Sequence, residues 1–169
     1  ILYFCSEYDL SLEVQKIFER EANIYSATCI FQGSRFSDEA RDMEFGIETV
    51  VRLAKRYDAS FEASCRRYVE ESNANCAFCS LEPIHGEDGI SVKLLYYIPS
   101  ATFPHRFQKG SIYGPEHAFS QLCNNCTEED FIITETRLTE SNEAKVIFET
   151  HIFFNSYTVL VLLKPIKIL

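Results

Sequence analysis

The stretch Cys76-Ala77-Phe78-Cys79-Ser80-Leu81-Glu82 marks the point at which this sequence changes from helical to strand-like spacing. Before it, apolar residues recur at the spacing of one face of a helix. After it, apolar side chains alternate with polar ones or run together in short segments, as they do in strands. The change predicts an α+β fold with two regions: a helical region over residues 1–74 and an antiparallel-sheet region over residues 75–169.

Capping residues and turn residues place the expected elements. Ser11 is positioned to cap a first helix that ends before Gly33, and Ser60 to cap a later helix. We expect a loop over residues 35–43, a helix beginning near Pro115 and a tight turn at residues 155–156. The expected helices span residues 11–31, 45–56 and 61–71, and the expected strands span residues 76–82, 91–98, 131–138, 145–154 and 157–164.

The composition is that of a folded chain that lacks the overall positive charge expected of a nucleic-acid-binding protein. Of 169 residues, 46% are hydrophobic and 14% aromatic, and the net charge is -9, whereas nucleic-acid binding normally requires a basic footprint. A local cluster of basic side chains lies on two expected helices that resemble a helix-turn-helix, so a DNA-binding regulator stays a weaker hypothesis. The cluster consists of Arg52, Lys55, Arg56, Arg66 and Arg67.

The cysteine count and the apolar runs indicate the compartment. Seven cysteines is an odd number, and no secretory leader pattern precedes them, so we expect a reduced, cytoplasmic protein. The longest apolar run, residues 157–163, is too short to cross a bilayer as a helix. We therefore expect no membrane partner.

Two carboxylates in the first expected helix are candidates for a functional role. Glu19 shares its side of the helix with the small residues Ala22 and Ser26, so another element can approach it closely. Glu21 instead falls within the apolar stripe of that helix. Spacing alone leaves open that both are solvated surface charges.

The pattern E-x-x-A-N-x-aromatic-x-A, formed by Glu19, Ala22, Asn23, Tyr25 and Ala27, resembles the second motif of the ImmA/IrrE family of zinc-dependent metallopeptidases. Residues 53–64 and 66–70 are similar to the segments that follow that motif, so the resemblance covers about residues 10–80. It implies that Glu19 is the third zinc ligand and that the intact protein is a hydrolase. It also implies a protein substrate such as a transcriptional repressor, in a phage, mobile-element or stress-response setting.

The sheet region resembles, by its order of elements, the GAF-like module that some members of this family carry. This resemblance implies that residues 75–169 sense a signal or position the substrate.

The sequence lacks the H-E-x-x-H motif that supplies two zinc-binding histidines and the general base of such enzymes. The four histidines, His85, His105, His117 and His151, are scattered. The apolar run at residues 1–5 has the character of a continuing helix. We therefore interpret the chain as beginning just after the motif, inactive as it stands, with a zinc site that is complete only in a longer protein. The catalytic residues remain unknown.

Two C-x-x-C pairs, Cys76 with Cys79 and Cys123 with Cys126, are an alternative structural-metal or thiol site. The first pair lies in an expected strand, where residues three apart point to opposite faces, whereas a four-thiolate zinc site needs both sulfurs together. The second pair, separated by Asn-Asn, is more turn-like. The remaining cysteines, Cys5, Cys29 and Cys65, are expected to be small core residues.

A second hypothesis stands beside the peptidase. A non-catalytic regulatory protein that keeps the same scaffold without zinc would bind a protein partner through its helical region.

Overall fold

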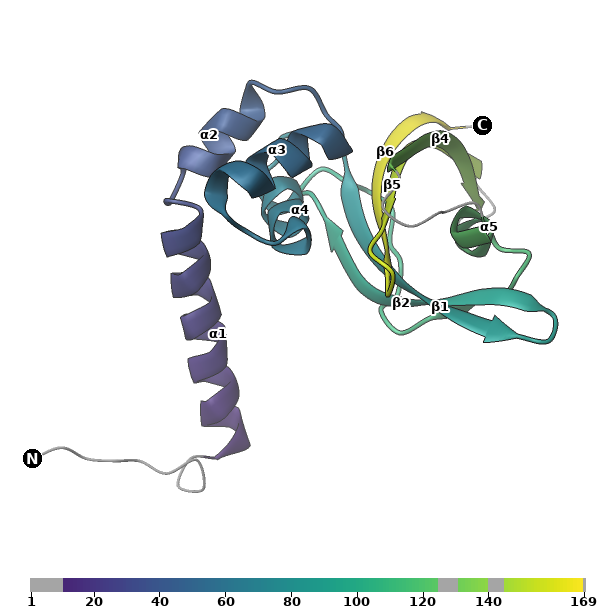
Figure 1. Cartoon of the computed structure of the whole chain (residues 1–169), viewed down its shortest axis with the longest axis horizontal. Coiled ribbons are helices and arrows are strands. Elements are labelled where there is room, and N and C mark those ends of the chain that lie inside the picture. The colour runs from purple at the N-terminus through teal and green to yellow at the C-terminus, as the bar shows by residue number, and fades with distance from the viewer. Residues whose placement is uncertain (1–10, 125–130, 140–144, 169) are drawn as a thin grey trace, which may run out of the picture.

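The computed structural model describes residues 11–124, 131–139 and 145–168. These residues form an α+β fold with five helices and a six-stranded antiparallel sheet (Figure 1). The helices are α1 (Leu12–Ile30), α2 (Arg35–Arg41), α3 (Ile47–Tyr57), α4 (Phe61–Glu70) and α5 (Ala118–Asn124). The strands are β1 (Ala77–Gly86), β2 (Gly89–Pro99), β3 (Ile112–Tyr113), β4 (Phe131–Thr139), β5 (Lys145–Phe154) and β6 (Val159–Ile168).

Serine caps begin α1 and α4 as the sequence predicts. The Ser11 hydroxyl accepts a hydrogen bond from the Val14 amide at 3.4 Å, and the Ser60 hydroxyl accepts one from the Ala63 amide at 3.1 Å. Each satisfies an amide that has no partner inside the first turn of its helix. The boundaries of these two helices are therefore confirmed to within a residue.

The loop predicted over residues 35–43 is wrong, because Arg35–Arg41 form α2. Phe36 is fully buried there, with its ring edge against Phe31 at 4.8 Å and against Tyr57 at 5.3 Å between centroids. An ion pair between Arg35 and Glu39, 3.2 Å apart and one turn apart on α2, adds a small local contribution. The predicted turn at Gly33 and Ser34 is present and ends α1, and burial of Phe36 favours a new helix directly after it.

The sheet has the order β3-β2-β1-β6-β5-β4, with every pair antiparallel. The first and last long strands, β1 and β6, lie side by side at its centre, with Cys79 opposite Val161. Gly86 pairs with Gly89 to close the β1–β2 hairpin. The predicted turn between β5 and β6 exists, but it includes Tyr157, which was expected to begin a strand and is instead exposed in the loop.

Both faces of the central strands are buried. One face packs against α3 and α4 through a cluster that includes Phe78, Leu160 and Leu162, and the other packs beneath α5 through a cluster that includes Leu81 and Val161. Strands covered on both sides need apolar residues at consecutive positions, which explains the uninterrupted apolar run of β6. The first cluster also crosses the predicted boundary near residue 74, so helical and sheet regions share a core.

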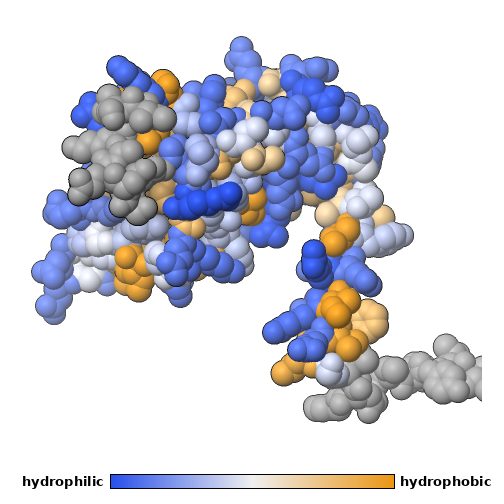
Figure 2. All heavy atoms as spheres, turned by 180° about the vertical axis from the view of Figure 1, so that it is seen from behind, coloured by the Kyte–Doolittle hydropathy of each residue, from blue (hydrophilic) through white to orange (hydrophobic). Residues whose placement is uncertain are grey.

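Helix α1 projects away from this core (Figure 1). None of its residues is buried, and Figure 2 shows apolar side chains gathered along it. Large apolar side chains are exposed at Leu12, Ile17, Phe18, Ile24, Tyr25 and Ile30. Among the described residues, no helix is both long enough and apolar enough to cross a membrane.

Candidate functional site

Glu19 lies on an exposed face of α1. Ala22, Asn23 and Ser26, which share its side of the helix, are exposed as well, and the Glu19 carboxylate forms no ion pair with another described residue. At one hundred degrees per residue, Ile17 and Phe18 fall on the other side of the same helix. The helix therefore presents a carboxylate bordered by small residues on one side and an apolar stripe on the other, and no described element covers either side.

The described residues do not form a zinc site by themselves. Across residues 11–124, 131–139 and 145–168, no group of three or more histidine, cysteine, aspartate or glutamate side chains is arranged to hold a metal ion. A zinc site built from Glu19 would need ligands from elsewhere, since structural and catalytic zinc sites use at least three protein ligands. We accordingly assign no catalytic step to the residues present.

The first cysteine pair diverges, as strand geometry predicts. Cys76 belongs to the cluster under α3 and α4, whereas Cys79 belongs to the cluster on the opposite face of the sheet. These two thiols lie on opposite faces of the sheet, so they cannot bind one ion together. Cys123 is buried at the end of α5, and Cys126 lies outside the described residues.

The other cysteines divide between core and surface. Cys65 is fully buried in the helical cluster, as expected, and burial raises its pKa well above the ordinary thiol value. Cys29 is exposed, so its assignment to the core is wrong. The reason is that α1 packs on no other described element along most of its length. Cys5 lies outside the described residues.

Three of the histidines occupy separate places. His85 is exposed near the β1–β2 turn. His105 is buried with its ring edge near Phe148, at 5.2 Å between centroids, and burial lowers its pKa. His117 stacks on Tyr113 at 4.3 Å, and burial lowers its pKa also. These positions do not bring the imidazoles together.

The fourth histidine, His151, joins strand β5 to the N-terminus of α3. Its Nδ1 atom accepts a hydrogen bond from the Ile47 amide at 3.4 Å, and its Nε2 atom lies 2.9 Å from the Glu149 Oε1 atom. Because Nδ1 is an acceptor, the neutral ring carries its proton on Nε2 and donates it to Glu149. That hydrogen bond is the main reason why the Glu149 pKa lies below its ordinary value.

Gly46 makes this contact possible. A Cβ atom at that position would lie 3.1 Å from the His151 Cε1 atom, and its φ of 156° favours glycine. Glu149 is also 3.6 Å from the Lys164 ammonium, whose nitrogen lies 5.2 Å from the Phe45 ring centre. The N-terminus of α3 is thus fixed to the sheet by an imidazole, a carboxylate and a close glycine.

A cleft of about 570 Å³ opens beside this contact. Its lining combines acidic residues with Arg52 and with apolar residues such as Ile133. Asp42, Glu44, Glu48 and Glu149 supply the acidic groups. Both nitrogens of His151 already have partners within the protein, so the imidazole orients α3 and is not free for proton transfer to a ligand. The contact was not predicted from the sequence, although Glu149 and His151, two residues apart in a strand, point to the same face.

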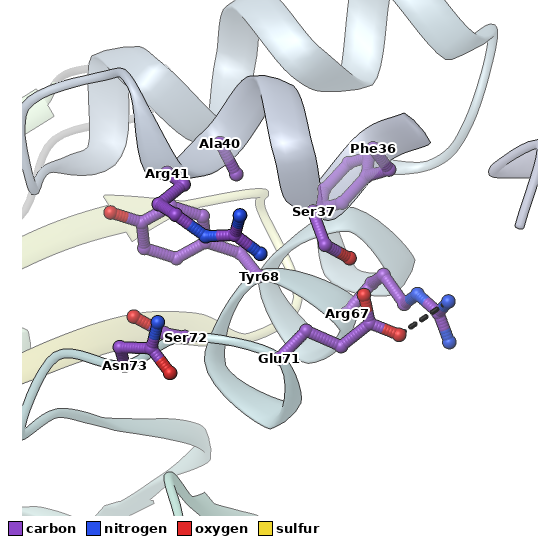
Figure 3. A pocket seen from close by; sticks show the side chains of 9 residues that line it. All are labelled: Phe36, Ser37, Ala40, Arg41, Arg67, Tyr68, Glu71, Ser72 and Asn73. Atoms are coloured by element: carbon purple, nitrogen blue, oxygen red, sulfur yellow. Dashed lines mark ion pairs between the residues drawn. The ribbon is translucent and has the colours of Figure 1, made fainter. Parts of the chain in front are cut away.

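A smaller cavity, about 30 Å³, lies between α2 and α4 (Figure 3). The Arg67 guanidinium forms an ion pair with Glu71 there and donates a hydrogen bond to the Gly33 carbonyl at 3.1 Å. The Ser37 hydroxyl and the Arg67 Nε atom are buried with no protein partner. A cavity of this size has room for one water molecule, and the hydrogen bond from Arg67 ties the turn after α1 to α4.

The basic cluster considered for DNA binding is partly engaged within the protein. Arg56 pairs with Glu39 at 2.9 Å and Arg67 with Glu71, while the Arg66 guanidinium lies 5.7 Å from the centre of the Tyr96 ring. Charges paired in this way contribute less to the binding of a phosphate backbone.

Neither a family model nor a curated protein sequence matches this chain.

Proposed function

We propose that this chain is the part of an ImmA/IrrE-like zinc metallopeptidase that follows the H-E-x-x-H helix. In the intact protein, Glu19 serves as the third zinc ligand. The reaction is hydrolysis of a peptide bond in a protein substrate such as a transcriptional repressor.

The observation that carries the proposal is the open face of α1 around Glu19. Its carboxylate is exposed and forms no ion pair with the residues that the structure describes, and Ala22 and Ser26 beside it leave room for another helix to approach. A helix of 19 residues with no buried side chain gains little stability from packing, and most helices in proteins depend on such packing. These features support the proposal that α1 packs, in the intact protein, against a further element that carries the remaining zinc ligands.

The proposal requires that the two histidines and the general-base glutamate come from a longer form of the protein. Zinc bound there would polarise the peptide carbonyl and activate water. Within this chain, the residues beside Glu19 would position that carboxylate.

The sheet region fits the same proposal as a GAF-like sensor or substrate-positioning module. Its support is the arrangement of an antiparallel sheet with helices on one face and α5 on the other. The shared core beneath α3 and α4 gives such a module a direct mechanical connection to the helices that follow α1.

The test is the zinc content of a longer gene product that carries H-E-x-x-H, compared with its Glu19→Ala variant. The matched control is Glu21→Ala, because Glu21 is equally exposed on the same helix but lies on its apolar side. We expect one zinc per chain that is lost with Glu19→Ala and kept with Glu21→Ala. Zinc that survives Glu19→Ala, or a longer gene product without the motif, would refute the proposal.

The exposed apolar stripe of α1 favours a second candidate, a non-catalytic module that binds a protein partner. Six large apolar side chains are exposed on that helix, and exposed apolar patches of this kind mark interaction sites. This candidate predicts no zinc in any form of the protein and loss of partner binding when Ile17 and Phe18 are changed to serine.

A further inference from the structure

Strand β4 ends the sheet with a free edge. It lies last in the order β3-β2-β1-β6-β5-β4, and no described strand pairs with its outer side. At the opposite edge, the chain covers β2 with the two-residue strand β3 and with backbone hydrogen bonds between Leu94 and residues 110 and 111. The β2 edge of the sheet is therefore partly paired with other backbone, whereas no described strand pairs with the β4 edge.

The sequence of β4 carries few of the usual protections of an edge strand, since it has no proline and no lysine and its charged side chains are Glu135 and Arg137. Native edges are blunted by proline, by charged side chains and lysine above all, by bulges, by shortness, or by a covering helix or loop. Strand β4 has nine residues, Phe-Ile-Ile-Thr-Glu-Thr-Arg-Leu-Thr, and pairs with β5 along its whole length without a bulge. It is rich in β-branched residues, and its side chains Phe131 and Ile133 are 45% and 60% exposed. Such a strand is a template for pairing with another strand.

Two charged side chains near the middle of β4 indicate which kind of strand would pair with it. Glu135 and Arg137 are exposed on the same face, the face that carries α3. Glu135 lies directly opposite Glu149 of β5, an arrangement of like charges that destabilises a strand pair. Neither Glu135 nor Arg137 has an ion-pair partner among the described residues, so the outer side of β4 carries an unmatched negative and an unmatched positive charge two residues apart.

We propose that β4 pairs antiparallel with β4 of a second copy of this chain, about a two-fold axis at Thr136. In this register, Glu135 lies opposite Arg137 of the second copy, and Arg137 lies opposite its Glu135. Two equivalent cross-strand ion pairs form from one sequence, as an isologous interface requires. The two sheets join into one, both α3 helices lie on the same side of it, and the exposed edge disappears.

The charge pattern selects this register. If the axis passed through Glu135, the two Glu135 side chains would face each other. With the axis at Thr136, each Glu135 is flanked by Glu149 of its own chain and by an arginine, so the like-charge contact is compensated. Pairing along one strand buries less surface than a standard interface. We therefore expect a weak dimer that dissociates on dilution.

Charge exchange at the two positions tests the proposal. Sedimentation equilibrium of this chain is compared with Glu135→Arg, Arg137→Glu and the double exchange. Either single change places like charges opposite each other twice, so we expect the dissociation constant of the dimer to rise roughly tenfold or more. The double exchange restores both pairs, and so does mixing the two single variants, which pair with each other. Glu70→Arg on α4, also exposed, is the control and leaves the equilibrium unchanged.

Far-UV circular dichroism confirms that each variant is folded before its mass is measured. A wild-type chain that stays monomeric up to millimolar concentration overturns the proposal. A dimer that the single changes do not weaken, or that the double exchange does not restore, overturns it as well, because the edge or the register is then different.

Discussion

Gly46→Ala tests whether the close contact between the N-terminus of α3 and His151 holds the helices on the sheet. The new Cβ atom would lie 3.1 Å from the His151 Cε1 atom, and the backbone has φ 156° and ψ 168°. Forcing atoms into a packed site costs about 1–3 kcal/mol, and holding alanine in a backbone region used almost only by glycine costs a similar amount. We expect the free energy of unfolding to fall by about 2–4 kcal/mol.

The steric part of that cost depends on the imidazole, so a double-mutant cycle isolates it. His151→Ala by itself removes the acceptor of the buried Ile47 amide and leaves a cavity, at a cost of about 2–4 kcal/mol. In the His151→Ala variant, the Cβ atom of Gly46→Ala has no imidazole to clash with. The free-energy cost of Gly46→Ala is then only that of its unfavourable backbone conformation. We expect the double variant to be more stable than the sum of the single effects predicts, by about 1–2 kcal/mol.

The assay is urea unfolding followed by far-UV circular dichroism, because the sequence has no tryptophan. Gly110→Ala is the matched control: its φ of +84° also favours glycine, but no atom lies within 4 Å of the added Cβ. It should show no coupling to His151. Effects of Gly46→Ala and His151→Ala that add to within about 0.5 kcal/mol would refute the contact as the reason for glycine at this position.

Two further predictions concern ionisable groups. Because the hydrogen bond from His151 lowers the folded pKa of Glu149, its stabilising effect is complete above the unfolded carboxyl pKa and is lost as pH falls through the lower folded value. Glu149→Gln should therefore flatten the pH dependence of unfolding stability below about pH 5, and an unchanged slope in this variant would contradict the assignment. For the thiols, burial raises the pKa of Cys65 and of Cys79, while Cys29 is exposed. Alkylation of the native protein, mapped by mass spectrometry, should modify Cys29 rapidly and the two buried thiols only after unfolding, and equal rates at the three positions would contradict the packing.

Caps and periodicity made most elements of the fold predictable. Ser11 and Ser60 act within one turn of their own positions, so the sequence alone places the starts of α1 and α4. The strands were predicted from alternation and apolar runs, and the divergence of Cys76 and Cys79 followed from the two-residue period of a strand. Helix α2 was missed because the burial of Phe36 depends on the ring of Phe31, directly after α1, and on the ring of Tyr57 in α3.

For the candidate site, the sequence predicted which residues are involved but not their surroundings in the fold. The sequence pattern selects Glu19 and its small neighbours, and the structure leaves them on an open helix face. The place of β4 at an edge, opposite a covered edge at β2, followed from pairing across the whole chain and had no local signal. The same holds for the contact of His151 with Gly46, which are far apart in the sequence.

The sequence by itself determined where α1 and α4 begin and that two regions of different periodicity follow one another, because these properties depend on residues a few positions apart. Only the tertiary structure decided that β1 and β6 lie together at the centre, that His151 fixes the N-terminus of α3, and that no other described element packs along most of α1 and no described strand pairs with the outer edge of β4. Those outcomes depend on which apolar surfaces meet, and the free energy of that choice is shared among residues that are distant along the chain.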